Sequence, residues 1–321
     1  MTLRSLVSGI DPLVRLLVLA ILLASFLPVS GEGKAAAQIV ADAAIFLLFL
    51  LNGLRLPRRD VAVGIANWRF LSPLFLWCFF GMGAAGWALW QAGLALLPTQ
   101  VALGFLFLGV LPSTVQSATA YSSLAGGNVA ISVVAAAVLN VAGVFVTAPL
   151  LALMAGGAGP GIDLAGLERI ATILLLPFAI GQVLQNRFGG LVKERRSLVS
   201  WMDRSAIAIA VYVAFSSAVE QGLWSLVGPA QWAVLLAFVA TFLAIGFGGA
   251  WWLGGAVGLA RAQRISFLFA GAQKSIALGA PLASVMFPPA LAGLILLPVL
   301  VYHLLQLVLS APLASRLNRQ G

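Results

Sequence analysis

The chain has 321 residues, of which 62% are hydrophobic and only 8% are charged, and this composition excludes an ordinary soluble globular domain. It indicates a polytopic helical membrane protein, because apolar runs of about twenty residues can cross a bilayer as helices. The net charge of +9 would suggest nucleic-acid binding in a soluble protein. In a membrane protein it fits basic cytoplasmic loops, so we expect the lipid bilayer and no nucleic acid as a partner.

Ten membrane-spanning helices are predicted. In chain order they cover Pro12–Pro28, Ala35–Leu54, Phe70–Trp90, Thr99–Ala125, Asn128–Ala155, Leu164–Arg187, Met202–Val219, Pro229–Leu259, Arg264–Phe287 and Pro289–Leu313. With the N-terminus inside, all but three of the 18 lysines and arginines fall on the cytoplasmic side; Lys34 and Arg169 lie outside and Lys274 lies within the membrane. This asymmetry predicts a multi-pass protein of the plasma (inner) membrane with both termini in the cytoplasm.

Polar residues interrupt the fourth predicted span in the stretch LPSTVQS, Leu111–Ser117. Pro112 lacks a backbone donor and clashes with the preceding helical turn, so the neighbouring hydroxyls and amide can serve freed backbone groups or a bound solute. The ninth span is interrupted in the same way by AQKS, Ala272–Ser275. Interrupted helices at corresponding positions of two chain halves are typical of a transporter site. The alternative is a plain proline kink whose hydroxyls bond to their own helix.

Short sequence echoes indicate an internal repeat. TAPLLA at Thr147–Ala152 ends the fifth span, and SAPLAS at Ser310–Ser315 ends the tenth. A unit of five spans begins inside the first time and outside the second, so the halves would be inverted repeats. We expect residues 1–155 to form the first five-helix repeat and residues 156–321 to form the second.

Lys274 is the most unusual single residue. It lies ten residues beyond Arg264, which puts it ~15 Å deep in a core ~30 Å thick. A charge at that depth costs at least ~2.5 kcal/mol and needs partners. Those partners can be the carbonyl ends of half-helices, Gln116 or a bound anion, and the alternative is a structural lysine that caps a broken helix. His303 and Gln306 either bond across helices or form a proton relay.

An enzyme is not expected. A metalloprotease helix needs two histidines in the pattern HExxH, and the chain has one histidine. The GxSxG motif of serine hydrolases is also missing from the sequence.

Seven short motifs carry a resemblance to a known family. They are LPSTVQS (Leu111–Ser117), GNVA (Gly127–Ala130), LLPFAIGQ (Leu175–Gln182), MDR (Met202–Arg204) with YVAFS (Tyr212–Ser216), KSIALGAP (Lys274–Pro281) and LPVLVYHLLQL (Leu297–Leu307). Together they resemble the bile acid:sodium symporter family, and most closely its divergent, cotransporter 7-like branch with bacterial symporters. The resemblance implies that helices four and nine are broken and crossed in a core domain of helices 3–5 and 8–10. It also implies a panel domain of helices 1, 2, 6 and 7, with a small organic anion moving between the two domains.

The resemblance further implies a sodium site near Thr119, Ser132 and Gln273. An acidic ligand of the family falls on Phe269, however, and Lys274 follows the glutamine. We therefore hypothesise that the lysine head fills space that sodium fills in other members. Sodium, proton or no coupling ion all stay open, and no other cofactor or metal is expected.

The sequence thus predicts an all-α membrane protein with ten helices in two inverted repeats, acting as a secondary active transporter of a small organic anion by alternating access. The alternatives are a sodium-independent, proton-coupled or passive carrier that uses Lys274, and a non-transporting membrane partner or sensor. Nine residues are expected to bind substrate or ion: Ser113, Thr114, Gln116, Ser117, Thr119, Ser132, Gln273, Lys274 and Ser275. Pro112 is expected to break the fourth helix, and Asn128 to cap the fifth, because asparagine is a favoured N-cap residue.

Overall fold

The protein is described by a computed structural model that places residues 11–55, 67–156, 168–169 and 171–319. Within these residues the chain forms helices and connecting turns, and it contains no β-strand. The chain divides into two compact units. Unit 1 comprises Met1–Arg55, Asp163–Trp224 and Ala280–Leu294, and unit 2 comprises Leu56–Ile162, Ser225–Gly279 and Ile295–Gly321.

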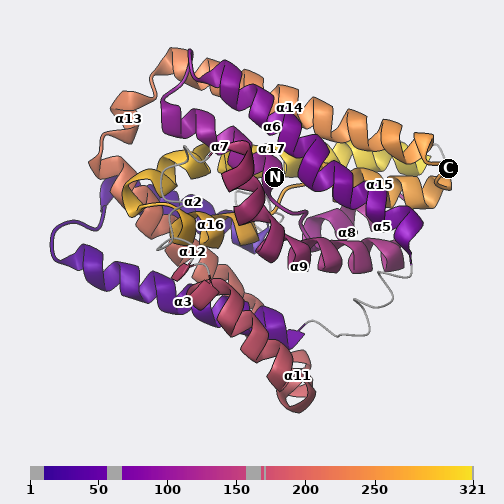
Figure 1. Ribbon diagram of the computed structural model, residues 1–321, viewed down its shortest axis with the longest axis horizontal. Helices are drawn as coiled ribbons and strands as arrows, with labels where there is room; N and C mark the ends of the chain where they lie inside the picture. The colour runs from indigo at the N-terminus through magenta and orange to yellow at the C-terminus, as the bar shows by residue number, and fades with distance from the viewer. Residues whose placement is uncertain (1–10, 56–66, 157–167, 170, 320–321) are drawn as a thin grey trace, which may run out of the picture. The chain divides into compact units, whose positions relative to one another are not determined.

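Unit 1 is built from the first helices of the chain and from its middle. Its described helices are α2 (Pro12–Phe26), α3 (Gly33–Arg55), the π-helical turn η2 (Ala171–Leu175), α11 (Leu176–Glu194), α12 (Arg196–Glu220) and α13 (Leu223–Leu226), followed by most of α16 (Ile276–Met286) and the start of α17 (Pro289–Arg319). Helices α3 and α11 lie side by side (Figure 1). Gly53 and Gly181 allow this close approach, because a Cβ on either glycine would collide with the backbone of the other helix.

Unit 2 holds the remaining helices. They are α5 (Trp68–Phe75), the π-helical turn η1 (Leu76–Gly81), α6 (Met82–Gly93), α7 (Thr99–Val110), α8 (Gln116–Leu124), α9 (Val129–Met154), α14 (Pro229–Ala256) and α15 (Arg261–Ala272), with the start of α16 and most of α17. Helix α7 is buried along its whole length after its first turn. Gly86 of α6 and Gly109 of α7 lie at their crossing, where a side chain on either would meet the facing backbone.

Seven helical runs are long and apolar enough to cross a membrane, among the residues that the structure describes. They are Gly33–Arg55, Trp68–Gly93, Val129–Met154, Arg196–Glu220, Pro229–Ala256, Arg261–Met286 and Pro289–Arg319. Helices α2 and α7 are apolar but shorter. The first residues of the sixth predicted span lie outside the described ranges, and η2 and α11 follow them. The count of ten spans stays a prediction.

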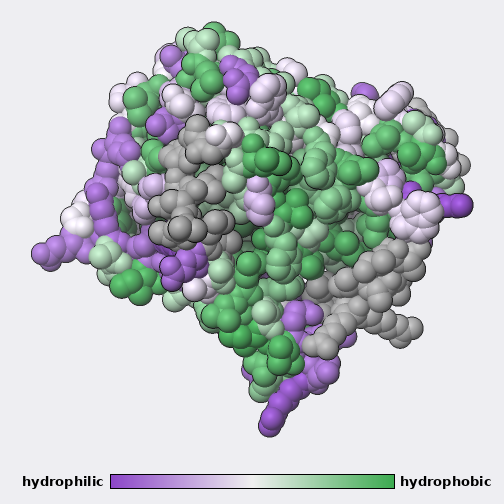
Figure 2. All heavy atoms as spheres, viewed as in Figure 1, coloured by the Kyte–Doolittle hydropathy of each residue, from purple (hydrophilic) through white to green (hydrophobic). Residues whose placement is uncertain are grey.

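Two helices extend beyond the predicted boundaries. Helix α12 begins at Arg196 rather than Met202, and α17 continues to Arg319 rather than Leu313. Both extensions contain arginine, which has a high helix propensity. Because arginine is hydrophilic, boundaries predicted from hydropathy stop short of it. Figure 2 shows hydrophobic side chains over much of the visible face and hydrophilic ones at the far end of α11, where Lys193, Glu194, Arg195 and Arg196 are exposed.

Candidate functional site

The first interruption lies between α7 and α8, where residues 111–115 are not helical. Leu111 has extended backbone angles (φ −69°, ψ 148°), and Pro112 follows it. Two side chains of α9 bond carbonyls that the break frees: Thr147 Oγ1 donates to Val110 O at 3.0 Å, and Asn140 Nδ2 donates to Ser113 O at 2.8 Å. Helix α9 therefore holds the open turn in one conformation.

The second interruption lies between α15 and α16, at residues 273–275. Gln273 ends α15 with extended backbone angles (φ −81°, ψ 140°). Ser275 begins the next helix, because its Oγ accepts a hydrogen bond from Leu278 N at 3.3 Å. Ser275 N also donates to Pro112 O at 2.9 Å. This backbone hydrogen bond shows that the two interruptions contact each other directly.

Lys274 is buried at this contact, with 1% of its surface exposed. Its Nζ donates to three backbone carbonyls: Cys78 O at 2.6 Å, Gly109 O at 2.8 Å and Leu111 O at 2.7 Å. Gly109 and Leu111 belong to the end of α7, where helix carbonyls lack intrahelical partners and carry partial negative charge. An ammonium has three N–H donors, so all of them are used, and each goes to a neutral carbonyl.

Gln273 connects the two interruptions through its side chain. Its Oε1 accepts hydrogen bonds from Thr114 Oγ1 at 2.9 Å and Ser117 Oγ at 2.6 Å, and its Nε2 donates to Ser310 Oγ at 3.0 Å. Thr114 Oγ1 also accepts from Ala118 N at 3.1 Å, and so serves the first turn of α8. The break residues of the two halves thus share one hydrogen-bond network.

Gln306 of α17 fixes the backbone on the other side of Lys274. Its Oε1 accepts from Lys274 N at 2.8 Å, and its Nε2 donates to Lys274 O at 3.0 Å. The same Nε2 lies 2.9 Å from Nδ1 of His303, which is 6% exposed. His303 and Gln306 are therefore adjacent, and Gln306 positions the lysine.

Two hydroxyls of α8 and α9 have no hydrogen-bond partner among the described residues. They are Thr119 Oγ1 of α8 and Ser132 Oγ of α9, and Ser132 is fully buried. Buried polar groups nearly always have partners, so these two atoms are candidate ligand contacts. Hydroxyl oxygens of this kind can coordinate a hard cation such as sodium.

The remaining predicted site residues lie in the first interruption or at the starts of α8 and α9. Gln116 is exposed at the first position of α8 and is not among the groups that bind Lys274. Ser113 is fully buried in the open turn. Asn128 precedes α9, and its Oδ1 accepts from Ile131 N at 3.1 Å.

Sequence reasoning missed four contributors to this site: Cys78, Asn140, Thr147 and Ser310. Of these four, only Asn140 could have been predicted from the sequence, since an amide inside an otherwise apolar helix needs a polar partner. Thr147 and Ser310 begin the two echoing motifs TAPLLA and SAPLAS. Thr147 bonds Val110, the last residue of α7, and Ser310 bonds Gln273 of the second interruption.

Comparison with known proteins gives a consistent result. A family model described as the SBF-like CPA transporter family matches residues 11–319. The chain is 36% identical to "Uncharacterized protein PA2026" of Pseudomonas aeruginosa, over 95% of this chain and 92% of that protein. It is 33% identical to "Putative symporter YfeH" of Escherichia coli, over 97% and 94% of the two chains. It is 22% identical to "Sodium/bile acid cotransporter 7" of Mus musculus, over 87% and 83%.

Proposed function

Because the chain belongs to the SBF-like CPA transporter family, we propose that it is a secondary active transporter that moves a small organic anion by alternating access. It is an integral multi-pass membrane protein, and its described residues include seven apolar helical runs that can span a bilayer. Its family transports solutes and its named relatives are a symporter and a cotransporter, so it is not an enzyme. The anion and the cycle are the proposed part.

The observation that carries this proposal is the contact between the two interruptions. Ser275 N bonds Pro112 O at 2.9 Å, and Gln273 bonds Thr114 and Ser117. Helices α8 and α16 begin at this point, so their free N–H groups contribute partial positive charge. An anion is favoured near helix N-termini for that reason.

We assign the anion to the polar groups around the start of α8. Ser117 is half-buried and Gln116 is exposed, so both are accessible from this end of the helix. Ser113, Thr114 and Ser275 are more deeply buried and would shape the open turns behind them. Lys274 neutralises charge from a distance, because its ammonium already donates to three carbonyls.

Sodium is the proposed coupling ion for two reasons. A related protein is named as a sodium/bile acid cotransporter, and the buried hydroxyls of Thr119 and Ser132 are free to coordinate an ion. The ion would bind near Thr119, Ser132 and Gln273. One observation favours a sodium-independent carrier as the second candidate: the Lys274 ammonium lies in a cage of carbonyls that would also suit a cation. In that case the lysine acts as a fixed cation, and His303 with Gln306 would serve proton movement.

The proposed architecture is ten spans in two inverted repeats, residues 1–155 and 156–321, with helices four and nine broken and crossed. The place of Thr147 and Ser310 in the two echoing motifs supports a repeat, because Thr147 bonds the end of α7 and Ser310 bonds Gln273. The core domain would comprise helices 3–5 and 8–10, and the panel domain helices 1, 2, 6 and 7. The placement of basic residues supports cytoplasmic termini in an inner membrane.

Uptake into proteoliposomes tests the proposal. Purified protein is reconstituted, and uptake of a panel of labelled small organic anions is measured with and without an inward sodium gradient. Saturable uptake of an anion supports transport, and its loss in Ser117→Ala but not in Ser72→Ala supports the site. Ser72 is a matched control because it is exposed on α5 and bonds only its own helix at Trp68 O. A protein that moves no anion would instead be a membrane partner or sensor.

A further inference from the structure

Unit 1 contains a cavity that the paired interruptions do not use. It has a volume of about 250 Å³ and lies among α3, α12 and the start of α17, with Val29, Val213 and Pro289 in its apolar wall. One water needs only roughly 10–15 Å³, and sites for drug-sized molecules begin at roughly 300 Å³. The cavity is far larger than a water site and slightly smaller than those sites, so it suits a small organic molecule.

The cavity carries one charged side chain, Lys34, among the residues that line it. Lys34 Nζ lies 2.7 Å from Glu220 Oε2, and the two side chains are 52% and 23% exposed. Exposed ion pairs of this kind contribute little to stability. Glu220 does not line the cavity, so a ligand inside the cavity can contact the Lys34 ammonium directly. The carboxylate of that ligand can replace the Glu220 carboxylate at small cost in free energy.

A polar group inside the cavity also lacks a partner. Ser216 lines it and is 1% exposed, and its Oγ makes no hydrogen bond within the described part of the chain. A buried hydroxyl without a partner is unusual and points to a ligand or water at this position. Ser217 lies beside it in the same wall.

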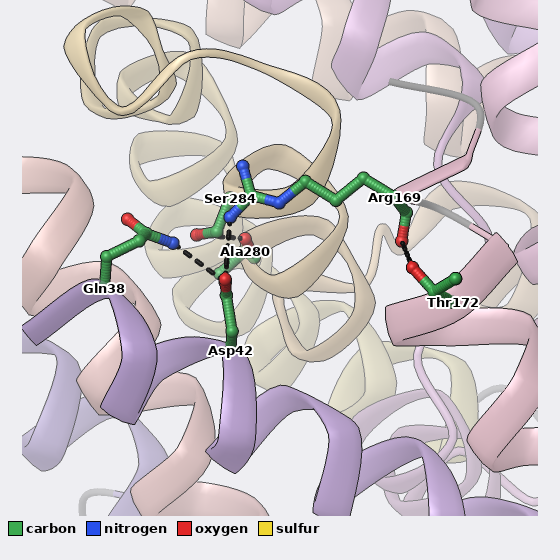
Figure 3. Close-up of polar contacts among 6 residues, drawn as sticks. All are labelled: Gln38, Asp42, Arg169, Thr172, Ala280 and Ser284. Carbon is green, nitrogen blue, oxygen red and sulfur yellow. Dashed lines mark hydrogen bonds and ion pairs between the residues drawn. The ribbon is translucent and has the colours of Figure 1, made fainter. Parts of the chain in front are cut away.

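The half-buried carboxylate of Asp42, on α3, does not oppose an anion in the cavity. Asp42 accepts hydrogen bonds from Gln38 Nε2 at 2.8 Å and from Arg169 at 2.9 and 3.0 Å. Figure 3 shows that the Gln38 amide nitrogen and the Arg169 guanidinium both point to this carboxylate, while the Gln38 oxygen points away from it. Gln38 lines the cavity and Asp42 does not, so the negative charge is neutralised outside the cavity wall.

We propose that this cavity binds a small organic carboxylate with an apolar body. The carboxylate pairs with the Lys34 ammonium, the body lies along the apolar wall, and a polar atom of the ligand or a bound water satisfies Ser216. This site is separate from the one proposed at the interruptions, and its occupancy does not depend on transport.

Benzoate is a suitable probe, with benzamide as its uncharged counterpart. Binding to the purified protein in detergent is titrated by saturation-transfer NMR, and size-exclusion chromatography checks that each variant is folded. We expect benzoate to bind more tightly than benzamide. Lys34→Gln should weaken benzoate binding about fivefold, since an ion pair with a half-exposed lysine is lost. Glu220→Gln should tighten it by a similar factor, because the competing carboxylate is gone.

Two controls make the result specific. Lys193→Gln removes an exposed lysine at the end of α11 and should leave binding unchanged. Ser216→Val should weaken benzoate binding without changing the charge of the cavity. If Lys34→Gln does not fold, weaker binding to Ser216→Val still supports the cavity site, and unchanged binding refutes it. Equal binding of benzoate and benzamide, or changes of the same sign in Lys34→Gln and Glu220→Gln, would overturn the inference.

Ser117→Ala separates this inference from the proposed function. It should stop anion uptake and leave benzoate binding intact. If it abolishes benzoate binding while Lys34→Gln does not, benzoate binds at the interruptions and the cavity site is refuted. If it leaves uptake unchanged, the transport site is refuted and the cavity site stands.

Discussion

Replacing Lys274 by methionine tests whether the ammonium holds the two interruptions together. Methionine has a similar length and no charge, so it removes three donors and preserves most of the packing. The carbonyls of Cys78, Gly109 and Leu111 lie 2.6, 2.8 and 2.7 Å from Nζ, and the lysine is 1% exposed, so water has little access to replace it. The loss therefore falls on buried backbone groups.

The magnitude follows from these contacts. A hydrogen bond from a charged donor contributes about 1.5–3 kcal/mol, so three bonds are worth about 4.5–9 kcal/mol in gross terms. Burying the ammonium costs several kcal/mol, and methionine avoids that cost. The difference predicts that Lys274→Met lowers the free energy of unfolding by about 2–4 kcal/mol.

The assay is equilibrium unfolding by SDS in mixed micelles, in a potassium buffer. Lys193→Met is the matched control, because that lysine is exposed at the end of α11, and its change should stay within about 0.5 kcal/mol. If Lys274→Met is as stable as Lys193→Met, or more stable than the wild type, the carbonyl cage contributes no net stability and the reasoning is refuted.

Three further predictions concern the packing and the ions of the site. Gly143→Ala should lower the free energy of unfolding by about 1–3 kcal/mol and reduce uptake, because a new Cβ would lie 2.5 Å from Cγ of Pro112. A Cβ added at Gly190 would meet no atom within 4 Å, so the control Gly190→Ala should not destabilise the protein. Equal effects of the two changes would contradict the packing argument. In a thermal unfolding assay, sodium at 100 times its dissociation constant should stabilise the wild type by about 2.7 kcal/mol relative to potassium. Ser132→Ala should abolish this difference. If the variant keeps the difference, sodium binds at another site. Lys274→Ala should be stabilised by sodium more than the wild type is, because the three carbonyls that bound the ammonium can then bind a sodium ion. If sodium and potassium stabilise the variant equally, these carbonyls do not form a sodium site.

The interruptions were readable from the sequence because each breaks a local rule. A proline with hydroxyls, and a lysine with a glutamine, are out of place within apolar segments, so Pro112 and Lys274 mark the two positions without any long-range information. The helix segments α7, α8, α15 and α16 end or begin where those residues stand.

The partners of Lys274 could be predicted only as kinds, because they come from distant parts of the chain. Among the three kinds that the sequence left open, the structure shows carbonyls at the end of a half-helix, Gly109 and Leu111, and it adds Cys78, which the sequence did not indicate. Gln116 was one of the three and lies exposed on α8 instead. The orphaned hydroxyls of Thr119 and Ser132 are likewise visible only once burial is known. The cavity beside Lys34 forms between helices and has no signature in the sequence.

The central claim is that a transported anion binds beside Ser117, where the two interruptions meet. Cysteine accessibility tests it directly, since the chain has a single cysteine, Cys78, which is buried. Ser117→Cys and the control Ser72→Cys are made in a Cys78→Ala background, reconstituted, and treated with a methanethiosulfonate reagent in the presence and absence of a transported anion. We expect that modification of Ser117→Cys blocks uptake and that the anion slows this modification, while Ser72→Cys is modified without either effect. Modification of Ser117→Cys that leaves uptake intact and is unaffected by the anion would show that no transported anion binds beside Ser117.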